Sequence, residues 1–289
     1  MSQNLICILG PTASGKTKYA VKLAYEKGGE IISADSRQVY KGMDIGTGKD
    51  LNDYLIAGVQ IPYHLIDIVD PGTKYNIFEY QRDFKKAYTD IVSRGKQPVL
   101  CGGSGLYIES VTRGYRLVEV PPDQELRKEL EKLSMEELTV RLASMKNLHN
   151  TTDLDSKKRV IRAIEIAIHE EENRIDYDQA ACPELTTRYI GIAVTREERI
   201  EKIDRRLKER LKGGMIEEVE RLLADGLTPE DLIYYGLEYK YVTLYLTGEL
   251  TYNQMEKQLA IAIHQFAKRQ MTWFRGMERR GINIEWITP

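Results

Sequence analysis

The chain has 289 residues, of which 42% are hydrophobic and 30% are charged, and its formal net charge is −2. This length suits one large domain that carries an insertion, and the near-neutral charge argues against a uniformly basic nucleic-acid binder while allowing local basic patches. No apolar run approaches the roughly 18 residues that a membrane span needs, and the first residues lack the features of a signal peptide, so we expect a cytoplasmic protein. The three cysteines, Cys7, Cys101 and Cys182, have no paired spacing typical of a disulfide framework or a zinc site.

Short apolar runs alternate with helical stretches in the N-terminal third of the chain. The predicted strands are residues 5–9, 31–34, 64–68 and 98–101, and the predicted helices are residues 16–26 and 77–94. Strands that alternate with helices need crossover connections, which predicts an α/β fold with a parallel sheet. The strand ends at Gly10, Asp35 and Gly102 should then lie along one edge, where such sheets bind ligands.

The pattern changes near residue 114, where two prolines precede charged helical stretches. These stretches are residues 123–132, 134–146 and 155–170, and they are followed by a predicted strand at 187–194 and by helices within 196–224 and at 251–276. The strand at 187–194 should rejoin the sheet. We therefore expect a catalytic core from residues 1–113 and 187–289, interrupted by an all-helical insertion at residues 114–186.

A phosphate-binding loop follows the first predicted strand. Its residues match the pattern G-x-x-x-x-G-K-[ST] in full and are Gly10, Pro11, Thr12, Ala13, Ser14, Gly15, Lys16 and Thr17. The glycines let backbone N–H groups converge on phosphate oxygens at the start of a helix. Lys16 can supply a charge for the terminal phosphate, and the Thr17 hydroxyl can bind Mg²⁺. The loop predicts a polyphosphate ligand without saying which one.

The usual companions of nucleotide hydrolysis are harder to find. Hydrolysis needs an aspartate that holds magnesium, yet the strand at 98–101 ends in glycines and Ser104. Asp67 is the one plausible substitute, and an ordinary carboxylate at a strand end explains it as well. In a reaction in which a nucleophile attacks carbon and diphosphate leaves, the phosphate-binding loop would still be needed. The aspartate that holds magnesium for nucleotide hydrolysis would not.

The second predicted strand ends in a polar segment, Asp35-Ser36-Arg37-Gln38. Asp35 could accept a proton as a general base, and the Gln38 amide could read an adenine edge. A turn in which the aspartate and serine side chains bond nearby backbone is the alternative interpretation.

Seven segments occur here in the order of a known family. They read G-P-T-A-S-G-K-T, D-S-R-Q-V-Y, G-M-D-I-G-T, H-L-I-D, G-G-S-G-L-Y, R-V-I-R-A-I-E and A-K-R-Q-M-T-W-F-R, and they span Gly10 to Arg275. In these segments the chain resembles the bacterial tRNA dimethylallyltransferases. The resemblance implies a P-loop NTPase-like core. It also implies transfer of a dimethylallyl group from its diphosphate to the exocyclic amine of the adenosine on the 3′ side of the tRNA anticodon. The sequence does not fix the oligomeric state, and we expect a monomer.

The resemblance also implies a role for each matching residue. The diphosphate would bind Gly10 and the segment from Thr12 to Thr17, with Mg²⁺ at Thr17. Asp35 resembles the general base, and Ser36, Arg37 and Gln38 would contact tRNA beside it. Ser104 stands where threonine is usual, and its hydroxyl keeps the expected contact to the RNA.

The insertion resembles the part of the family that grips tRNA. Lys158, Arg159 and Arg162 share one helix face by their spacing, within a predicted tRNA-contact segment that also includes Val160 and Ile161. Val160, together with Ile164, Ala167 and Ile168, should face a core. Arg127 is a weaker candidate for RNA contact. The alternative is a solvated charged face that Asp155 and Glu165 neutralise.

The C-terminal half has two smaller basic surpluses, in residues 196–212 and 264–281. In the last helix, an apolar stripe should face the core; it comprises Met255, Leu259, Ile263, Phe266 and Trp273. Lys268 and Arg275 should face outward. Tyr63, His264 and Phe266 depart from the residues that are common in the family, which bears on tRNA affinity more than on the chemistry.

Three other functions compete with this interpretation. An adenylate dimethylallyltransferase would use the same chemistry on free AMP. A P-loop small-molecule kinase would consume ATP. An RNA-binding module without catalysis would not need Lys16 and Thr17.

Overall fold

The computed structural model describes residues 4–145, 154–173 and 185–288. Contacts divide the chain into two compact units, a core unit of Met1–Tyr115 with Cys182–Pro289 and a helical unit of Arg116–Ala181. The expected insertion covers residues 114–186. Cys182 itself lies outside the described residues, whereas Cys7 and Cys101 are buried free thiols.

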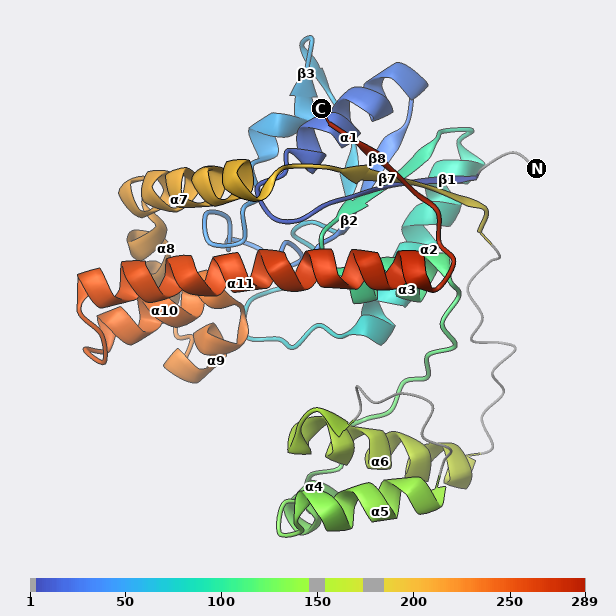
Figure 1. Ribbon diagram of the computed structural model, residues 1–289, viewed down its shortest axis with the longest axis vertical. Coiled ribbons are helices and arrows are strands. Elements are labelled where there is room, and N and C mark those ends of the chain that lie inside the picture. The colour runs from blue at the N-terminus through green and yellow to red at the C-terminus, as the bar shows by residue number, and fades with distance from the viewer. Residues whose placement is uncertain (1–3, 146–153, 174–184, 289) are drawn as a thin grey trace. The chain divides into compact units, whose positions relative to one another are not determined.

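A six-stranded parallel sheet forms the centre of the core unit, in the spatial order β5-β2-β6-β1-β7-β8. Its strands are β1 (Leu5–Leu9), β2 (Glu30–Ala34), β5 (Tyr63–His64), β6 (Pro98–Gly102), β7 (Thr187–Ile192) and β8 (Ile284–Ile287). β1, β2 and β6 are buried along their whole length. Helices cover the sheet on both faces (Figure 1), which explains why these strands read as unbroken apolar runs. The α/β class with a parallel sheet is confirmed.

The helices of the core unit are α1 (Lys16–Lys27), α2 (Ile77–Ser93), α3 (Gly105–Thr112), α7 (Arg196–Lys212), α8 (Met215–Ala224), α9 (Pro229–Tyr234), α10 (Leu237–Leu246) and α11 (Tyr252–Arg279). α1 packs on one face of the sheet and α2 and α3 pack on the other, whereas α7 to α10 contact mainly one another and α11. Successive side chains of β1 alternate between the faces. Ile6 and Ile8 pack in one cluster with Ala20 of α1, and Leu5 and Leu9 pack in the other, larger cluster with the helices of the opposite face.

The expected strand at 64–68 is wrong beyond its first residue. β5 ends at His64 because Leu65 and Asp67 have backbone φ angles of 62° and 55°, which no strand can contain. A 3₁₀ turn (Leu51–Tyr54) and a short hairpin of β3 (Leu55–Ile56) and β4 (Val59–Gln60) precede it. Strand β8 was not expected from the sequence, and it pairs with β7 at the edge of the sheet.

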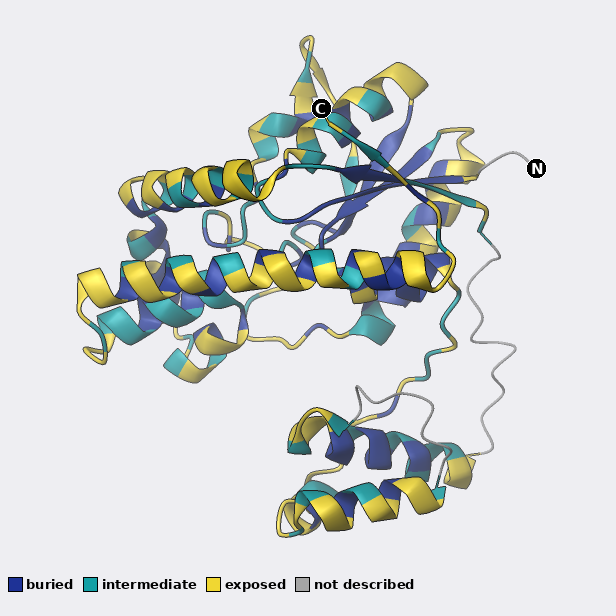
Figure 2. Cartoon of the chain, in the orientation of Figure 1, coloured by how far each residue is buried: buried dark blue, intermediate teal, exposed yellow. Residues whose placement is uncertain are grey.

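Helix α11 buries a slightly different stripe from the one expected. Met255, Leu259 and Ile263 are buried, but the Phe266 residue is 38% exposed. The buried stripe continues through Ala267 and Gln270 instead, so that the helix alternates buried and exposed residues along its length (Figure 2). Phe266 lies one position to the side of this stripe.

The helical unit has its own apolar core. Its helices are α4 (Gln124–Leu130), α5 (Met135–Met145) and α6 (Lys157–Asn173). One cluster joins Leu130 of α4, Leu138 and Leu142 of α5, and Val160 and Ile164 of α6. Both helical expectations for this region, three helices and an inward face at Val160 and Ile164, are confirmed. In the described part of the chain, no helix is long and apolar enough to cross a membrane.

Candidate functional site

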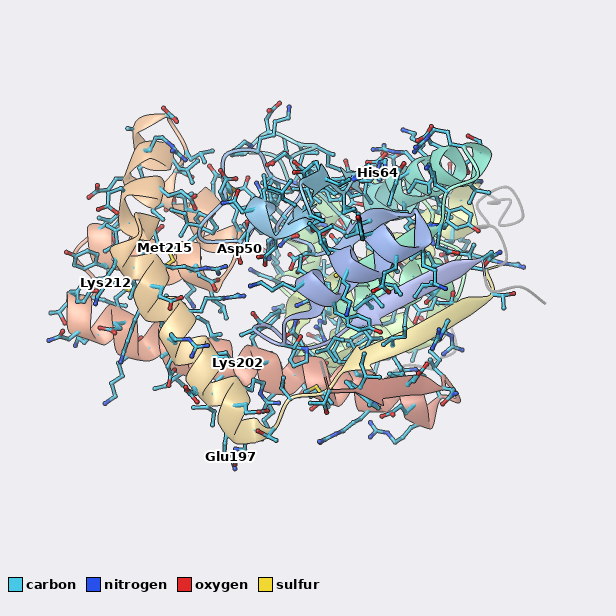
Figure 3. The ribbon with its side chains drawn as sticks, turned by 90° about the horizontal axis from the view of Figure 1, so that it is seen from above. Asp50, His64, Glu197, Lys202, Lys212 and Met215 are labelled. Carbon is cyan, nitrogen blue, oxygen red and sulfur yellow. The ribbon has the colours of Figure 1, made fainter. Side chains whose placement is uncertain are left out.

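A cavity of about 1000 Å³ opens at the carboxyl ends of β1, β2 and β6. Its lining includes Thr12–Thr17 after β1, Asp35–Gln38 after β2, and Gly102 with Ser104 after β6. The structure therefore brings the sequence-predicted loop and polar segment to one cavity. Figure 3 views the core unit from above and labels Lys202 of α7 and Asp50, which also line it.

The phosphate loop has the backbone that an anion cradle requires. Ala13 and Gly15 adopt positive φ angles of 61° and 85°, and α1 begins at the next residue, Lys16. A side chain at Gly10 would place its Cβ 2.7 Å from the Ser14 hydroxyl, so glycine leaves room for this hydroxyl in its present position. The Ser14 hydroxyl is buried and has no hydrogen-bond partner among the described residues. An unpaired buried hydroxyl is costly, which is the state expected of a group that awaits a ligand oxygen.

Two cations reach this loop. Lys16 Nζ lies 3.3 Å from the Pro11 carbonyl oxygen, and burial lowers the pKa of Lys16. Arg206 of α7 donates to the Thr12 hydroxyl at 2.9 Å. Burial and then the neighbouring Arg210 lower the pKa of Arg206 to about 10. Because desolvation disfavours a charged group, the downward shift of both pKa values indicates a site that a bound anion would stabilise.

Arg206 was not singled out from the sequence, where it is one of several basic residues in a mixed-charge helix. The helical spacing of apolar residues in α7 could have identified Arg206 in the sequence. Ile203, Leu207 and Leu211 form its buried face, and Arg206 stands directly beside that stripe. Arg210 instead pairs with Asp50, with 3.2 Å between nitrogen and oxygen.

Gln270 of α11 was also missed, although it belongs to the A-K-R-Q segment. Its side-chain oxygen accepts from the Thr12 N–H at 2.8 Å, and its amide nitrogen donates to the Gly103 carbonyl at 3.0 Å. Gln270 is buried, so these two bonds tie the phosphate loop to the end of β6 through the C-terminal helix.

The Asp35–Gln38 segment is both a bonded turn and part of the cavity wall. Asp35 Oδ1 accepts from the Arg37 N–H at 2.8 Å, as the turn interpretation expects. The Ser104 hydroxyl accepts from the Ser36 N–H at 3.3 Å, which joins this segment to β6. The Arg37 guanidinium lies 5.2 Å from the centre of the Tyr234 ring. The two interpretations of this segment are therefore compatible.

Asp67 does not line the cavity. Its carboxylate pairs with the buried Lys49 ammonium, and its left-handed backbone places it past the end of β5. Because Lys49 already neutralises the Asp67 carboxylate, this residue fits the interpretation as an ordinary carboxylate at a strand end better than the interpretation as a magnesium ligand.

The basic residues of the helical unit differ in their surroundings. Arg127 makes two 2.7 Å bonds to the buried Glu165, which also accepts from Arg162 at 3.1 Å. Arg162 donates in addition to the Val120 carbonyl at 2.7 Å. Arg159 pairs with Asp155 at 2.6 Å, and Lys158 is exposed.

Two residues of the predicted tRNA-contact segment point inward. Val160 and Ile161 are 0% and 5% exposed and belong to the core of the helical unit. Their side chains cannot reach an RNA, because the apolar face of α6 that they form is covered by α4 and α5. The inward face expected at Val160 is therefore confirmed, and tRNA contact by this segment stays a prediction.

A family model described as IPP transferase matches residues 38–277, and another described as isopentenyl transferase matches residues 3–67. The chain belongs to the IPP transferase family. The tRNA dimethylallyltransferase 2 of Bacteroides fragilis is 63% identical over 284 residues, which are 98% of this chain and 92% of that protein. The tRNA dimethylallyltransferase 1 of Parabacteroides distasonis is 59% identical over 286 residues, with 99% and 92% covered.

Solved structures show the same fold. The crystal structure of the full-length tRNA isopentenylpyrophosphate transferase from Bacillus halodurans matches with a TM-score of 0.71 and 32% identity. The match covers 99% of this chain and 90% of that chain. A eukaryotic dimethylallyltransferase acting on tRNA matches in fold with a TM-score of 0.79, at 22% identity.

The three departures from the family pattern fall in different places. Tyr63 packs its ring against Tyr54, with 4.9 Å between ring centres, and does not line the cavity. His264 Nε2 lies 2.8 Å from an Asp204 oxygen, also away from the cavity. Phe266 is in the lining, near the Arg269 guanidinium at 5.9 Å. Only the third of these residues is therefore placed to affect a ligand directly.

The oxygen ligands at this cavity do not form a ready-made metal cage among the described residues. Among the described residues, no three or more histidine, cysteine, aspartate or glutamate side chains form a group that could hold a metal ion. The Thr17 hydroxyl and the Asp35 carboxylate do line the cavity. Mg²⁺ usually keeps several waters and binds one or two protein oxygens together with substrate phosphates. The residues present fit a Mg²⁺ that arrives with a diphosphate.

Proposed function

We propose that this chain transfers the dimethylallyl group of dimethylallyl diphosphate to the exocyclic amine of the adenosine that follows the tRNA anticodon, releasing diphosphate. One observation carries the proposal: a single cavity is lined both by a phosphate loop with two desolvated cations beside it and by Asp35 and Gln38 at the end of β2, two strands away in the sheet. The names of the relatives, tRNA dimethylallyltransferases at 63% and 59% identity, support it.

The phosphate side of the cavity would bind and stabilise the leaving group. Backbone N–H groups of the loop, the Ser14 hydroxyl, Lys16 and Arg206 would surround the diphosphate oxygens, and Thr17 would hold Mg²⁺. When bound, Mg²⁺ would neutralise part of the diphosphate charge. Charge grows on the diphosphate as its bond to the allylic carbon breaks, so donors fixed in advance around it lower the barrier.

Asp35 would act as the general base. The lone pair of the adenine amine is delocalised into the ring, so this nitrogen is a weak nucleophile until it loses a proton. Asp35 uses Oδ1 in its own turn, which fixes the carboxylate, while Oδ2 accepts no hydrogen bond from another described residue. Oδ2 can therefore receive the amine proton as the new nitrogen–carbon bond forms.

The acceptor is inferred to be a nucleotide flipped out of an RNA loop. Taking a base out of its stack is the usual way for an enzyme to reach a base atom, and an unpaired loop makes that step easier. Ser36, Arg37, Gln38 and Ser104 would contact the RNA at the cavity, and Lys158 and Arg159 of the helical unit would contact its phosphates. We also propose that the enzyme acts in the cytoplasm as a monomer.

The decisive experiment supplies labelled dimethylallyl diphosphate together with either unmodified tRNA or AMP, with and without ATP. We expect label in tRNA, no need for ATP, and poor use of AMP. A tRNA with guanosine at the acceptor position is the matched control and should stay unlabelled. Efficient labelling of AMP would favour the adenylate dimethylallyltransferase, and ADP formed in step with product would favour the kinase.

A further inference from the structure

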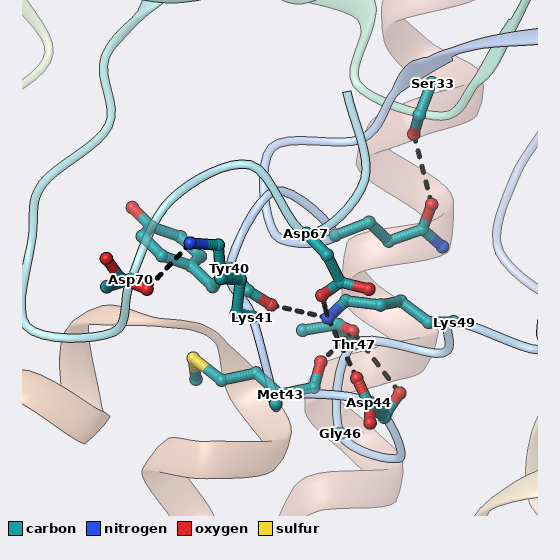
Figure 4. Close-up of polar contacts among 12 residues, drawn as sticks. Ser33, Tyr40, Lys41, Met43, Asp44, Gly46, Thr47, Lys49, Asp67 and Asp70 are labelled. Carbon is teal, nitrogen blue, oxygen red and sulfur yellow. Dashed lines mark hydrogen bonds and ion pairs between the residues drawn. The ribbon is translucent and has the colours of Figure 1, made fainter. Parts of the chain in front are cut away.

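Two buried charges of opposite sign hold the turn of residues 42–49, which we name the GMDIGTGK turn. Lys49 is the first. Its ammonium donates to the Tyr40 carbonyl and to the carboxylates of Asp44, at 2.9 Å, and Asp67 (Figure 4). The Lys49 side chain is fully buried, and all three of its donors are used.

Glu218 of α8 is the second charge. Its Oε2 accepts from the N–H groups of Asp44 and Ile45 at 2.9 and 2.8 Å. Its Oε1 accepts from the Gly46 N–H at 3.0 Å and from the Tyr239 hydroxyl at 2.7 Å. Glu218 is 4% exposed. Charge-assisted bonds of this kind are among the strongest available to a buried group.

The turn needs such anchors because its sequence is flexible. It contains glycine at positions 42, 46 and 48, and glycine gives the unbound backbone wide conformational freedom. Gly46 cannot be replaced, since a Cβ there would lie 2.6 Å from the Tyr239 ring. Ile45, Gly46, Thr47 and Gly48 all line the cavity. The two buried charges therefore fix a wall of the site.

One hydrogen bond connects this wall to Gln38. The Gly48 carbonyl accepts from Gln38 Nε2 at 3.1 Å, and Gln38 Oε1 faces the Ser33 hydroxyl, also at 3.1 Å. A carbonyl oxygen can only accept, whereas a hydroxyl can donate or accept. The position of the Gly48 carbonyl therefore decides which end of the Gln38 amide carries the donor.

We propose that Lys49 and Glu218 are positioning residues for base selection, because they hold the GMDIGTGK turn where Gly48 sets the donor and acceptor ends of Gln38. This inference rests on the proposed function, in which Gln38 faces an adenine. At position 6 adenine offers a donor and guanine an acceptor, so an amide held in one orientation can tell them apart. An amide free to flip would lose that discrimination.

The test measures acceptor selectivity with the full-length enzyme and two anticodon stem-loop RNAs. One RNA carries the acceptor adenosine, and the other carries guanosine there and serves as an inert competitor. The ratio of the competitor's inhibition constant to the KM of the adenosine RNA reports selectivity. We expect Lys49→Met to raise that KM by about tenfold or more and to lower the ratio by about fivefold, with the KM for dimethylallyl diphosphate unchanged.

Matched variants separate positioning from folding. Lys41→Met removes an exposed lysine that directly precedes the turn and pairs with Asp70 at 3.0 Å (Figure 4), and it should change neither constant. Glu218→Gln should act like Lys49→Met, whereas Glu217→Gln, at the exposed neighbouring position, should not. If Lys49→Met fails to fold, Asp67→Asn leaves Lys49 bonded to Asp44 and should lower the ratio by a smaller factor.

An unchanged ratio in these variants, with a lowered melting temperature alone, would overturn the inference and leave both charges as structural anchors. A KM for dimethylallyl diphosphate that rises as much as the KM for RNA would do the same. Use of AMP instead of RNA by the wild-type enzyme would refute the proposed acceptor only. The same ratio, measured with AMP and GMP, would then still test the positioning of Gln38.

Discussion

The phosphate loop and helix α6 both carry clustered basic residues, yet their charges are used differently. Around the loop, Lys16 and Arg206 are desolvated and no carboxylate of a described residue forms an ion pair with either one. On α6, Arg162 and the nearby Arg127 share the buried Glu165, whereas the ion pair of Arg159 with Asp155 is exposed and does not involve a buried carboxylate. A cation that lacks a protein partner in a cavity points to a ligand, whereas a cation already paired with a buried carboxylate is part of the fold.

The comparison predicts the largest effect at the reacting end of the cavity. Asp35→Asn keeps the shape and the turn acceptor of Asp35 but removes the base, so kcat should fall by about a hundredfold or more. The KM for dimethylallyl diphosphate should stay the same. Rapid-quench turnover with labelled diphosphate measures both constants, and Asp70→Asn is an exposed control. Near-normal turnover in Asp35→Asn would exclude Asp35 as the base.

The next effect concerns the unpaired cations. Arg206→Met should raise the KM for dimethylallyl diphosphate by about tenfold to a hundredfold, because a charge-assisted bond to a phosphate oxygen is lost. The KM for tRNA should change little. Lys208→Met, on an exposed position of the same helix, provides the comparison, and titration calorimetry with the diphosphate alone gives an independent affinity. If both variants bound dimethylallyl diphosphate with equal affinity, Arg206 would have only a structural role.

A smaller effect is expected from the paired cations, and it should appear in stability. Burial acts to raise the pKa of Glu165, but the bonds from Arg127 and Arg162 more than offset it and hold the pKa below its ordinary 4.5. This stabilisation is present above pH 4.5 and is lost as the pH falls through the lowered pKa. Glu165→Gln should cost the helical unit about 1–3 kcal/mol at neutral pH and flatten its response to acid.

Circular dichroism of the helical signal against pH would test this, with Glu129→Gln as the exposed control on α4. Dimethylallyl diphosphate binding should persist in Glu165→Gln, because the phosphate loop belongs to the core unit. If Glu165→Gln lost both diphosphate binding and the circular dichroism signal, the expectation that diphosphate binding depends on the core unit alone would be wrong.

Local patterns predicted the fold well where one physical cause dominated. The buried run at 5–9, the phosphate loop and the helix after it follow from burial on both faces and from glycine geometry. Residues 64–68 were misjudged because an apolar run does not reveal the left-handed backbone of Leu65 and Asp67. Arg206, Gln270 and Glu218 escaped prediction because each bonds to a loop far away in sequence. The Glu218 bonds to the turn, for example, join residues more than 170 positions apart. Lys49 escaped prediction because only the fold of the loop brings Tyr40, Asp44 and Asp67 to its ammonium.

The smallest predicted effect is that of Lys158 on tRNA binding, and it separates a cation of α6 that is unpaired among the described residues from the paired arginines. This lysine is exposed on α6, and the described residues form no ion pair with it, so it is the cleanest probe of RNA contact in the helical unit. The triple variant of Lys158, Arg159 and Arg162 would confuse RNA binding with stability, since Arg162 also holds Glu165 and the Val120 carbonyl. Lys158→Ala alone should raise the KM for tRNA by a few-fold, about the value of one exposed phosphate contact, and lower the slope of log affinity against log salt by about one unit.

The melting temperature should not change in Lys158→Ala, because its ammonium supports no buried group. Lys128→Ala, which removes an exposed lysine paired with Glu125 at 3.0 Å on α4, gives a control of equal charge. An identical salt slope for both variants and the wild type would show that α6 is a solvated charged face. A shallower slope for Lys158→Ala alone would assign this helix to the RNA and confine the structural arginines to Arg127 and Arg162.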